Sequence, residues 1–346
     1  MPTFFEHQEL MKAPPIKRAA YSDRTAWIMA ELARLVYERL PNEQELDELL
    51  KKIIGAIEKD APKRELISMT AEFAASTNET QESKTDAILK LQNYELFRSY
   101  SIGGTECMVV KIPENPEANF AGMFVVVFRG TEPKSMADLK ADLTANLMAA
   151  PGGGRVHTGF YRAYEKVGDI LKEDIKEAGA LPVYITGHSL GGALALVATR
   201  YIGSDSVGAT YTFGGPRVGD DEFFQKIKTP VYRIVNAADG VARIPFGAGL
   251  SIAVTVIRLI PFNGTRKIAD LVARFFSGYT HYGDKKLLTT HTQKKPVQVF
   301  SSPSIFKTML QVVLPRMLAT KGKASFQDHC MDGYCDKLAD YAKRRI

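Results

Sequence analysis

The chain has 346 residues, of which 45% are hydrophobic and 24% are charged, as is usual for a folded globular protein. Its three cysteines are too few and odd in number for a disulfide framework, and their surroundings lack the paired ligands of a zinc site, so we expect no metal. The net charge of +6 comes without a nucleic-acid-binding motif, and we therefore expect no nucleic-acid partner.

The first 100 residues show mostly the periodicity of helices. Ser22 or Asp23 caps a run whose apolar face consists of Ile28, Leu32, Leu35, Val36 and Leu40. Because no Gly/Ser-rich linker follows, we expect residues 1–100 to form a helical region packed on the core of one domain spanning residues 1–346. The N-terminus lacks a basic stretch followed by an apolar core, so we expect the protein to be cytoplasmic or exported without a classical signal peptide.

Strand-like runs begin after this region. The first two, residues 105–112 and 123–128, flank a polar segment that is typical of a hairpin loop. Further apolar or β-branched runs lie at residues 181–186, 231–236, 286–289 and 297–300. We predict an α/β protein with a mostly parallel central sheet flanked by helices.

The most informative motif is residues 187–191, Gly-His-Ser-Leu-Gly, which fits the pattern Gly-x-Ser-x-Gly. A strand-like run precedes it and a helix-like run, residues 193–198, follows it. Strand, sharp turn and helix are the context of a nucleophile elbow, in which glycines let the serine hydroxyl stand clear. We therefore predict that Ser189 is a nucleophile.

An activated serine needs a base and an acid that orients the base, and both follow the serine in α/β-hydrolases. Asp239 lies just after the strand-like run 231–236, at the sheet edge where parallel sheets bind ligands. Asp205, Asp220 and Asp221 compete, but none of them directly ends a strong strand. Asp239 is thus the predicted acid.

Chain order and surroundings leave two histidines as candidates for the base. His281 enters a strand, whereas His329 lies beyond the last strand-like run and starts a terminal helix. The apolar positions of that helix have helical spacing and are Met331, Tyr334, Cys335 and Leu338. A base on a loop after the last strand can swing over the serine, so we favour His329 and keep His281 as the alternative.

Several blocks in this order resemble the class 3 lipases, the fungal-type triacylglycerol lipases of the α/β-hydrolase fold. The blocks are residues 125–131, 156–160, 185–192, 212–219, 235–245, 279–281 and 328–329. The resemblance runs from about Thr105 to Leu338, and the helix start at residues 20–25 resembles bacterial members. One departure is Ala242, where the family usually has proline.

The resemblance implies that Ser189 is the nucleophile, Asp239 the acid and His329 the base. It also implies an oxyanion hole formed by Thr131 and the backbone N–H of Leu190. We therefore predict a serine carboxylic-ester hydrolase that acts on lipid esters through an acyl-enzyme and needs no cofactor. Alternatives are a phospholipase A1, a soluble esterase, a leaderless antibacterial lipase toxin, or an inactive hydrolase fold that binds lipid or a partner.

Two insertions, residues 247–276 and 302–324, depart from the family pattern. The first contains a basic, amphipathic stretch that includes Arg266, Lys267, Ile268, Arg274 and Phe275. Such a stretch suits peripheral contact with an anionic membrane surface. The alternative is an insertion that packs on the core and turns a basic face outward. The sequence predicts no particular oligomeric state.

Overall fold

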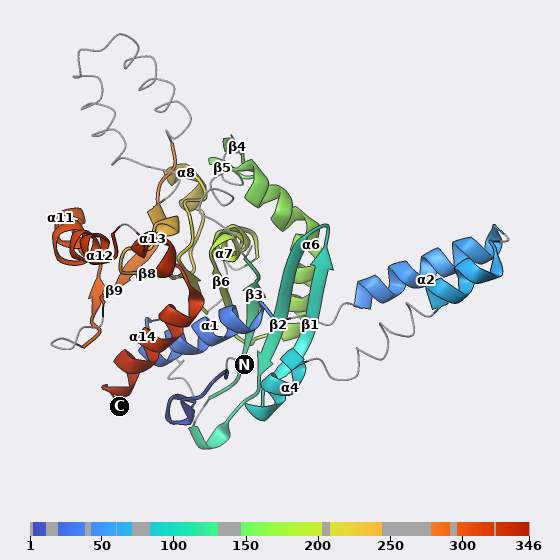
Figure 1. Cartoon of the computed structure of the whole chain (residues 1–346), viewed down its shortest axis with the longest axis horizontal. Coiled ribbons are helices and arrows are strands. Elements are labelled where there is room, and N and C mark those ends of the chain that lie inside the picture. The colour runs from blue at the N-terminus through green and yellow to red at the C-terminus, as the bar shows by residue number, and fades with distance from the viewer. Residues whose placement is uncertain are drawn as a thin grey trace, which may run out of the picture.

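The structure, a computed structural model, describes residues 3–11, 20–38, 43–59, 61–70, 84–118, 120–130, 147–202, 208–243, 278–290, 296–321 and 323–345. The described strands form an eight-stranded sheet in the order β1-β2-β3-β6-β7-β8-β9-β10 (Figure 1). Its strands are β1 (Glu95–Ile102), β2 (Thr105–Ile112), β3 (Met123–Phe128), β6 (Val183–His188), β7 (Thr210–Phe213), β8 (Val231–Asn236), β9 (Asp284–Leu288) and β10 (Val299–Ser301). A separate two-stranded sheet pairs β4 (Leu147–Ala149) with β5 (Arg155–His157).

The centre of the large sheet is parallel. Strands β3, β6, β7, β8 and β9 run in the same direction, whereas β1-β2-β3 and β9-β10 pair antiparallel. This arrangement confirms the predicted fold class, and the hairpin joining β2 to β3 is also as predicted. The helical expectation for residues 1–100 fails at its end, because Glu95–Ile102 forms the edge strand β1. Gly103 and Gly104, both at positive φ, turn the chain tightly into β2.

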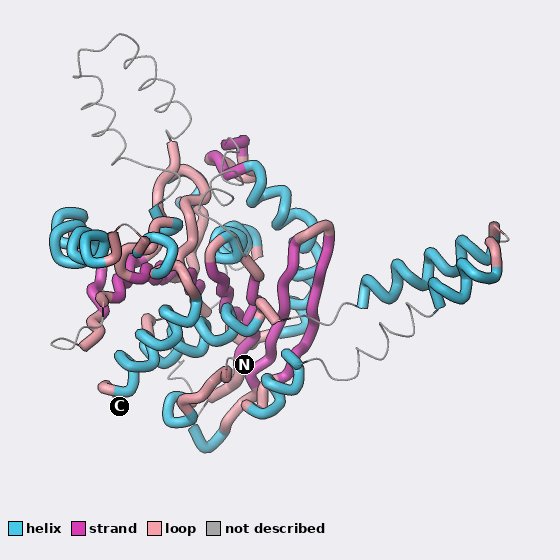
Figure 2. The backbone as a smooth tube through the Cα atoms, viewed as in Figure 1, coloured by secondary structure: helices cyan, strands magenta, loops and turns pink. Residues whose placement is uncertain are grey.

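Helices cover both faces of the sheet (Figure 2). On one face lie α1 (Asp23–Leu35) and α14 (Met331–Lys343), and on the other α6 (Thr158–Ala178) and α7 (Leu190–Tyr201). The alternation of side chains along β3 makes two cores: Val125 and Val127 join the first, and Phe124, Val126 and Phe128 join the second. The predicted apolar face of the last helix is buried, as expected.

Some helices lie outside these layers. Figure 1 shows α2 (Glu43–Glu58) and the helical residues 63–70 extending away from the body, and α4 (Lys84–Leu91) beside the sheet. The second half of the chain also contains short helices, α8 (Asp221–Phe224), α11 (Ile305–Thr308), α12 (Leu314–Ala319) and α13 (Ala324–Gln327). Between α11 and α12 the helix widens into a π turn, Met309–Val313, since Pro315 has no N–H to continue the regular ladder. Within the described residues no helix is long and apolar enough to cross a membrane.

Candidate active site

Ser189 lies in the sharp turn between β6 and α7. Its backbone angles, φ 57° and ψ −127°, fall outside the regions that side-chain-bearing residues favour, at a cost of roughly 1–3 kcal/mol. Close packing explains the flanking glycines. A Cβ on Gly187 would lie 2.3 Å from the Gly191 carbonyl oxygen, and one on Gly191 would lie 2.3 Å from the Phe128 carbonyl oxygen. The motif therefore holds the serine by the shape of the backbone.

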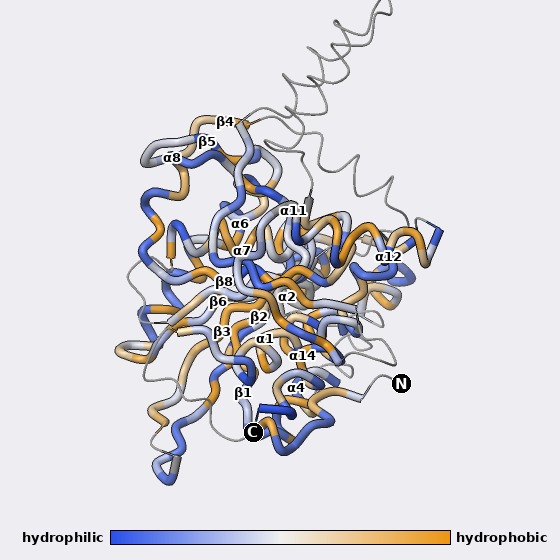
Figure 3. Tube along the Cα trace, turned by 90° about the vertical axis from the view of Figure 1, so that its left-hand side faces the viewer, coloured by the Kyte–Doolittle hydropathy of each residue, from blue (hydrophilic) through white to orange (hydrophobic). Residues whose placement is uncertain are grey.

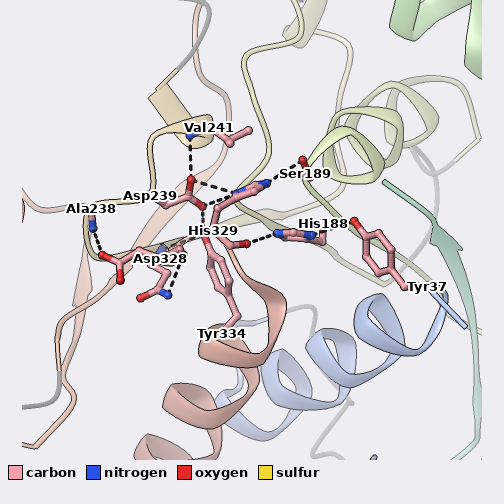
Figure 4. A network of polar contacts seen from close by, with 10 residues as sticks. Tyr37, His188, Ser189, Ala238, Asp239, Val241, Asp328, His329 and Tyr334 are labelled. Carbon is pink, nitrogen blue, oxygen red and sulfur yellow. Dashed lines mark hydrogen bonds and ion pairs between the residues drawn. The ribbon is translucent and has the colours of Figure 1, made fainter. Parts of the chain in front are cut away.

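The structure brings Ser189, His329 and Asp239 together (Figure 4). The distance from Ser189 Oγ to His329 Nε2 is 2.9 Å. On the other side of the ring, Nδ1 lies 3.0 Å and 3.1 Å from the two carboxylate oxygens of Asp239. All three side chains are buried. This is the hydrogen-bonded order in which a carboxylate orients an imidazole and the imidazole accepts the proton of a hydroxyl.

Two further groups donate hydrogen bonds to the Asp239 carboxylate. The Val241 N–H reaches Oδ1 at 2.9 Å, and the Tyr334 hydroxyl reaches Oδ2 at 2.6 Å. Burial, and next the charge of Asp239, raise the pKa of Tyr334 far above its usual range, so the phenol keeps its proton. The Tyr334 oxygen also accepts from the Asn236 N–H at 3.0 Å. These two donors hold the Asp239 carboxylate in position beside the His329 ring.

His188, inside the elbow motif, holds the backbone of His329. Its Nε2 lies 2.8 Å from the His329 carbonyl oxygen, and its Nδ1 lies 3.0 Å from the Tyr37 hydroxyl. Because a carbonyl only accepts, Nε2 carries the proton and Nδ1 accepts from Tyr37. Burial, and next the neighbouring His329, lower the pKa of His188 well below its usual value. A neutral His188 thus links Tyr37, just after α1, to the backbone of His329.

Asp328 joins the two loops that carry Asp239 and His329. Its Oδ2 accepts from the Ala238 N–H at 3.0 Å, and its backbone oxygen accepts from Asn236 Nδ2 at 2.9 Å. Asp328 is 3% exposed, so its carboxylate depends on protein donors, the Ala238 N–H and the Arg316 guanidinium, rather than on water. One residue therefore positions the neighbours of both Asp239 and His329.

Gly214 is a site residue to which sequence reasoning assigned no role of its own. It follows β7 at a φ of 59°, and an added Cβ would lie 2.6 Å from Asp239 Oδ2 and 3.0 Å from His329 Nδ1. The close contact between Asp239 and His329 therefore leaves room only for glycine at position 214. A glycine directly after a parallel strand is the signal that points to such an approach. Tyr334 was predicted as buried, but its hydroxyl contact with Asp239 was not foreseen.

The other predicted site residues fall into two groups. Leu190 is the first residue of α7, so its N–H lies at a helix N-terminus, where such groups lack an intrahelical acceptor. His281 precedes β9 as predicted and is half-buried, but it is His329 that contacts Ser189. Burial, and next Arg233, lower the pKa of His281. The remaining residues lie outside the described part of the chain, and they are Thr131, Arg266, Lys267, Ile268, Arg274 and Phe275.

A cavity of about 440 Å³ lies beside the elbow. Its lining includes Gly130 at the end of β3 and Leu190 and Leu194 on α7, together with His157 and Phe160. The lining is partly apolar and partly polar, and it adjoins the helix N-terminus that follows Ser189.

Comparison with known proteins shows which family this chain resembles. Residues 125–248 match the family model of Lipase (class 3). Secreted mono- and diacylglycerol lipase 1 of Fusarium solani is 40% identical over 110 residues, which are 30% of this chain and 32% of that protein. Toxin TseL of Vibrio cholerae is 29% identical over 233 residues, which are 60% of this chain and 35% of that protein. The lipase of Rhizomucor miehei in its native propeptide complex is 26% identical, with a TM-score of 0.45 and coverage of 63% of each chain.

The chain spans about a third of the length of the curated relatives it matches. The matched segment contains the elbow, β7, β8 and Asp239, while His329 lies beyond it. The predicted resemblance to the class 3 lipases is confirmed, and residues 125–248 carry the match to that family model.

Proposed function

We propose that this chain is a serine carboxylic-ester hydrolase that acts on lipid esters. The observation that carries the proposal is the buried, hydrogen-bonded series Ser189, His329 and Asp239 on a strained elbow. An inactive hydrolase fold would have no need to maintain backbone strain at the serine together with three hydrogen-bond donors around the Asp239 carboxylate.

The geometry supports a two-step acyl transfer. Ser189 Oγ attacks the ester carbonyl while His329 Nε2 takes its proton, and Asp239 holds the imidazole by its Nδ1–H. The Leu190 N–H, with Thr131, would stabilise the oxyanion of the tetrahedral intermediate. His329 then gives the proton to the leaving alcohol, and water releases the acid from the acyl-enzyme in the same way. These steps call on no cofactor.

The choice of lipid esters rests on the family match and on the cavity beside Leu190, whose partly apolar lining suits an acyl chain. Labelling with a fluorophosphonate probe tests the nucleophile, because only an activated serine reacts. Hydrolysis of p-nitrophenyl esters of several chain lengths, a triacylglycerol and a phospholipid then identifies the substrate. A protein that is neither labelled nor active on any of these esters would refute the proposal.

A second candidate role is that of an exported lipase toxin. Of the two curated relatives compared by sequence, the bacterial toxin covers the larger part of this chain, 60% against 30%. Expression in the cytoplasm and in the periplasm of a bacterial host, each beside the Ser189→Ala variant, tests this role. Growth arrest in one compartment that disappears with Ser189→Ala supports it, and normal growth in both compartments contradicts it.

We also propose peripheral contact between residues 247–276 and anionic lipid. The basic residues Arg266, Lys267 and Arg274 would meet the lipid head groups, beside the apolar Ile268 and Phe275. Replacing the three basic residues by Glu should weaken binding to anionic vesicles at low salt and leave hydrolysis of a soluble ester unchanged. Loss of both properties together would indicate a structural segment instead.

A further inference from the structure

The second insertion forms a helical segment, Ile305–Ala319, that packs directly on the loop carrying the proposed acid. Val312 joins a buried cluster with Val235 and Ala237, and Val313 contacts Ala238. The segment therefore has a defined inner face, and it lies beside β9, next to the edge strand β10 (Figure 1). Its outer face is turned away from this core.

That outer face exposes large apolar side chains. The exposed fractions are 45% for Met309, 48% for Leu310, 45% for Leu314 and 71% for Leu318. Leu310, Leu314 and Leu318 are spaced four residues apart, so they lie along one side of the helix. Figure 3 shows hydrophobic residues along α12 with hydrophilic ones at its end. An exposed row of this kind marks a surface that binds another apolar body.

The basic residues near this apolar row indicate the kind of surface that it binds. Residues 302–324 contain four basic residues, Lys307, Arg316, Lys321 and Lys323, and no Asp or Glu. Lys307, Lys321 and Lys323 are exposed, and the Lys307 ammonium lies 4.2 Å from the centroid of the Phe300 ring. An apolar row flanked by lysines is complementary to a bilayer with anionic head groups, into which leucines insert while lysines remain at the phosphates.

Helix α2 provides an internal comparison. It also exposes aliphatic side chains, with exposed fractions of 43% for Leu50, 47% for Ile54 and 59% for Ile57. Its sequence, however, has five acidic residues and two lysines, a net charge of −3. An anionic bilayer repels this helix and attracts the C-terminal segment. Charge therefore distinguishes two faces that apolar exposure alone does not.

We propose that Ile305–Ala319 is a docking surface for an anionic lipid bilayer, with Leu310, Leu314 and Leu318 as its inserting residues. This binding does not depend on ester hydrolysis. The inner face of the segment is connected to the candidate site through Asp328. Arg316 Nη2 donates to Asp328 Oδ1 at 3.0 Å, and the other carboxylate oxygen of Asp328 accepts from the Ala238 N–H. Docking through this segment places the loops of Asp239 and His329 next to the membrane.

Vesicle binding tests the proposal in the Ser189→Ala background, where lipid is not consumed, so its failure is separate from a failure of the proposed enzyme activity. Vesicles of phosphatidylcholine, with and without phosphatidylglycerol, are sedimented with each protein. Replacing Leu310, Leu314 and Leu318 by Ser should weaken binding to the anionic vesicles at least about tenfold, because three buried apolar contacts are lost. Replacing Lys307, Lys321 and Lys323 by Glu should weaken it similarly at low salt, and high salt should remove the difference.

The matched control replaces Leu50, Ile54 and Ile57 on α2 by Ser and should bind the anionic vesicles normally. Each set is also made with Ser189 intact and assayed on a soluble short-chain ester, which reports whether the fold survives. If the variant with the three leucines replaced loses this activity, its fold is damaged. Vesicle binding by the variant with the three exposed lysines replaced then tests the proposal. Normal vesicle binding by the lysine set at low salt, or an equal loss in the α2 control, overturns the proposal.

Discussion

The two halves of the candidate site are held in different ways. The nucleophile half is contiguous in the chain: Ser189, its flanking glycines and the start of α7 lie within a few residues of one another. The acid–base half is assembled from distant segments, with Asp239 90 residues from His329 and 95 residues from Tyr334. Backbone shape positions the serine, whereas side-chain hydrogen bonds position the base. A motif can therefore encode the first half, and only the folded chain can complete the second.

The largest expected effect comes from removing either half outright. Ser189→Ala and His329→Ala should each lower kcat by about 10⁶-fold, as is found when a nucleophile or its base is lost. His281→Ala should retain substantial activity, because His281 does not contact Ser189. Ester hydrolysis by the three purified variants, each with an unchanged circular dichroism spectrum, checks this. An inactive His281→Ala beside an active His329→Ala would reverse the assignment of the base.

Gly214 tests whether the meeting of acid and base depends on backbone space. Gly214→Ala places a Cβ 2.6 Å from Asp239 Oδ2, so the carboxylate must shift. Since a misplacement of about 1 Å can cost about 10²-fold in rate, we expect a loss of that size in kcat. Gly179→Ala is the matched control, because Gly179 also has positive φ but no atom within 4 Å of the added Cβ. Equal activity in the two variants would show that the close approach is unimportant.

Tyr334 tests a single donor in the acid–base half. Tyr334→Phe removes the hydroxyl that donates to Asp239, and hydrogen bonds to charged groups contribute about 1.5–3 kcal/mol. We expect kcat to fall about tenfold with little change in KM, because the contact orients the base rather than the substrate. Tyr282→Phe, whose hydroxyl donates to the Ile227 carbonyl, should behave as wild type. A change in KM alone would point to a role in substrate binding.

The smallest expected effect is on stability in acid. His188 has a pKa lowered by burial, so the unfolded chain binds its proton more readily than the folded one. The contribution of neutral His188 is therefore present above pH 6.5, its ordinary value, and is lost as the pH falls below it, by up to about 1.4 kcal/mol per pH unit. Urea unfolding between about pH 7.5 and pH 5.5 should show this slope, and His188→Gln should flatten it. If the free energy of unfolding of His188→Gln depends on pH as steeply as that of the wild type, another group causes the acid sensitivity. His281, whose pKa is also lowered, is then the next residue to test.

Much of the fold followed from local patterns. Apolar or β-branched runs predicted β2, β3, β6 and β8, and the spacing of Met331, Tyr334 and Leu338 predicted the buried face of α14. The edge strand β1 was missed because it lies within a largely helical stretch and exposes much of its length. Its identity depends on pairing with β2, which no single segment encodes.

By itself the sequence determined the elbow, because strand, glycine, serine and helix signals occupy adjacent positions and act through local backbone geometry. It also indicated Asp239 and His329, since chain order and strand ends restrict where an acid and a base can lie. Only the tertiary structure decided that Gly214 leaves room for their contact, that Tyr334 and Val241 hold the carboxylate, and that Asp328 joins their loops. These contacts join residues separated by tens of positions along the chain, and their partners become neighbours only when the sheet and its helices have packed.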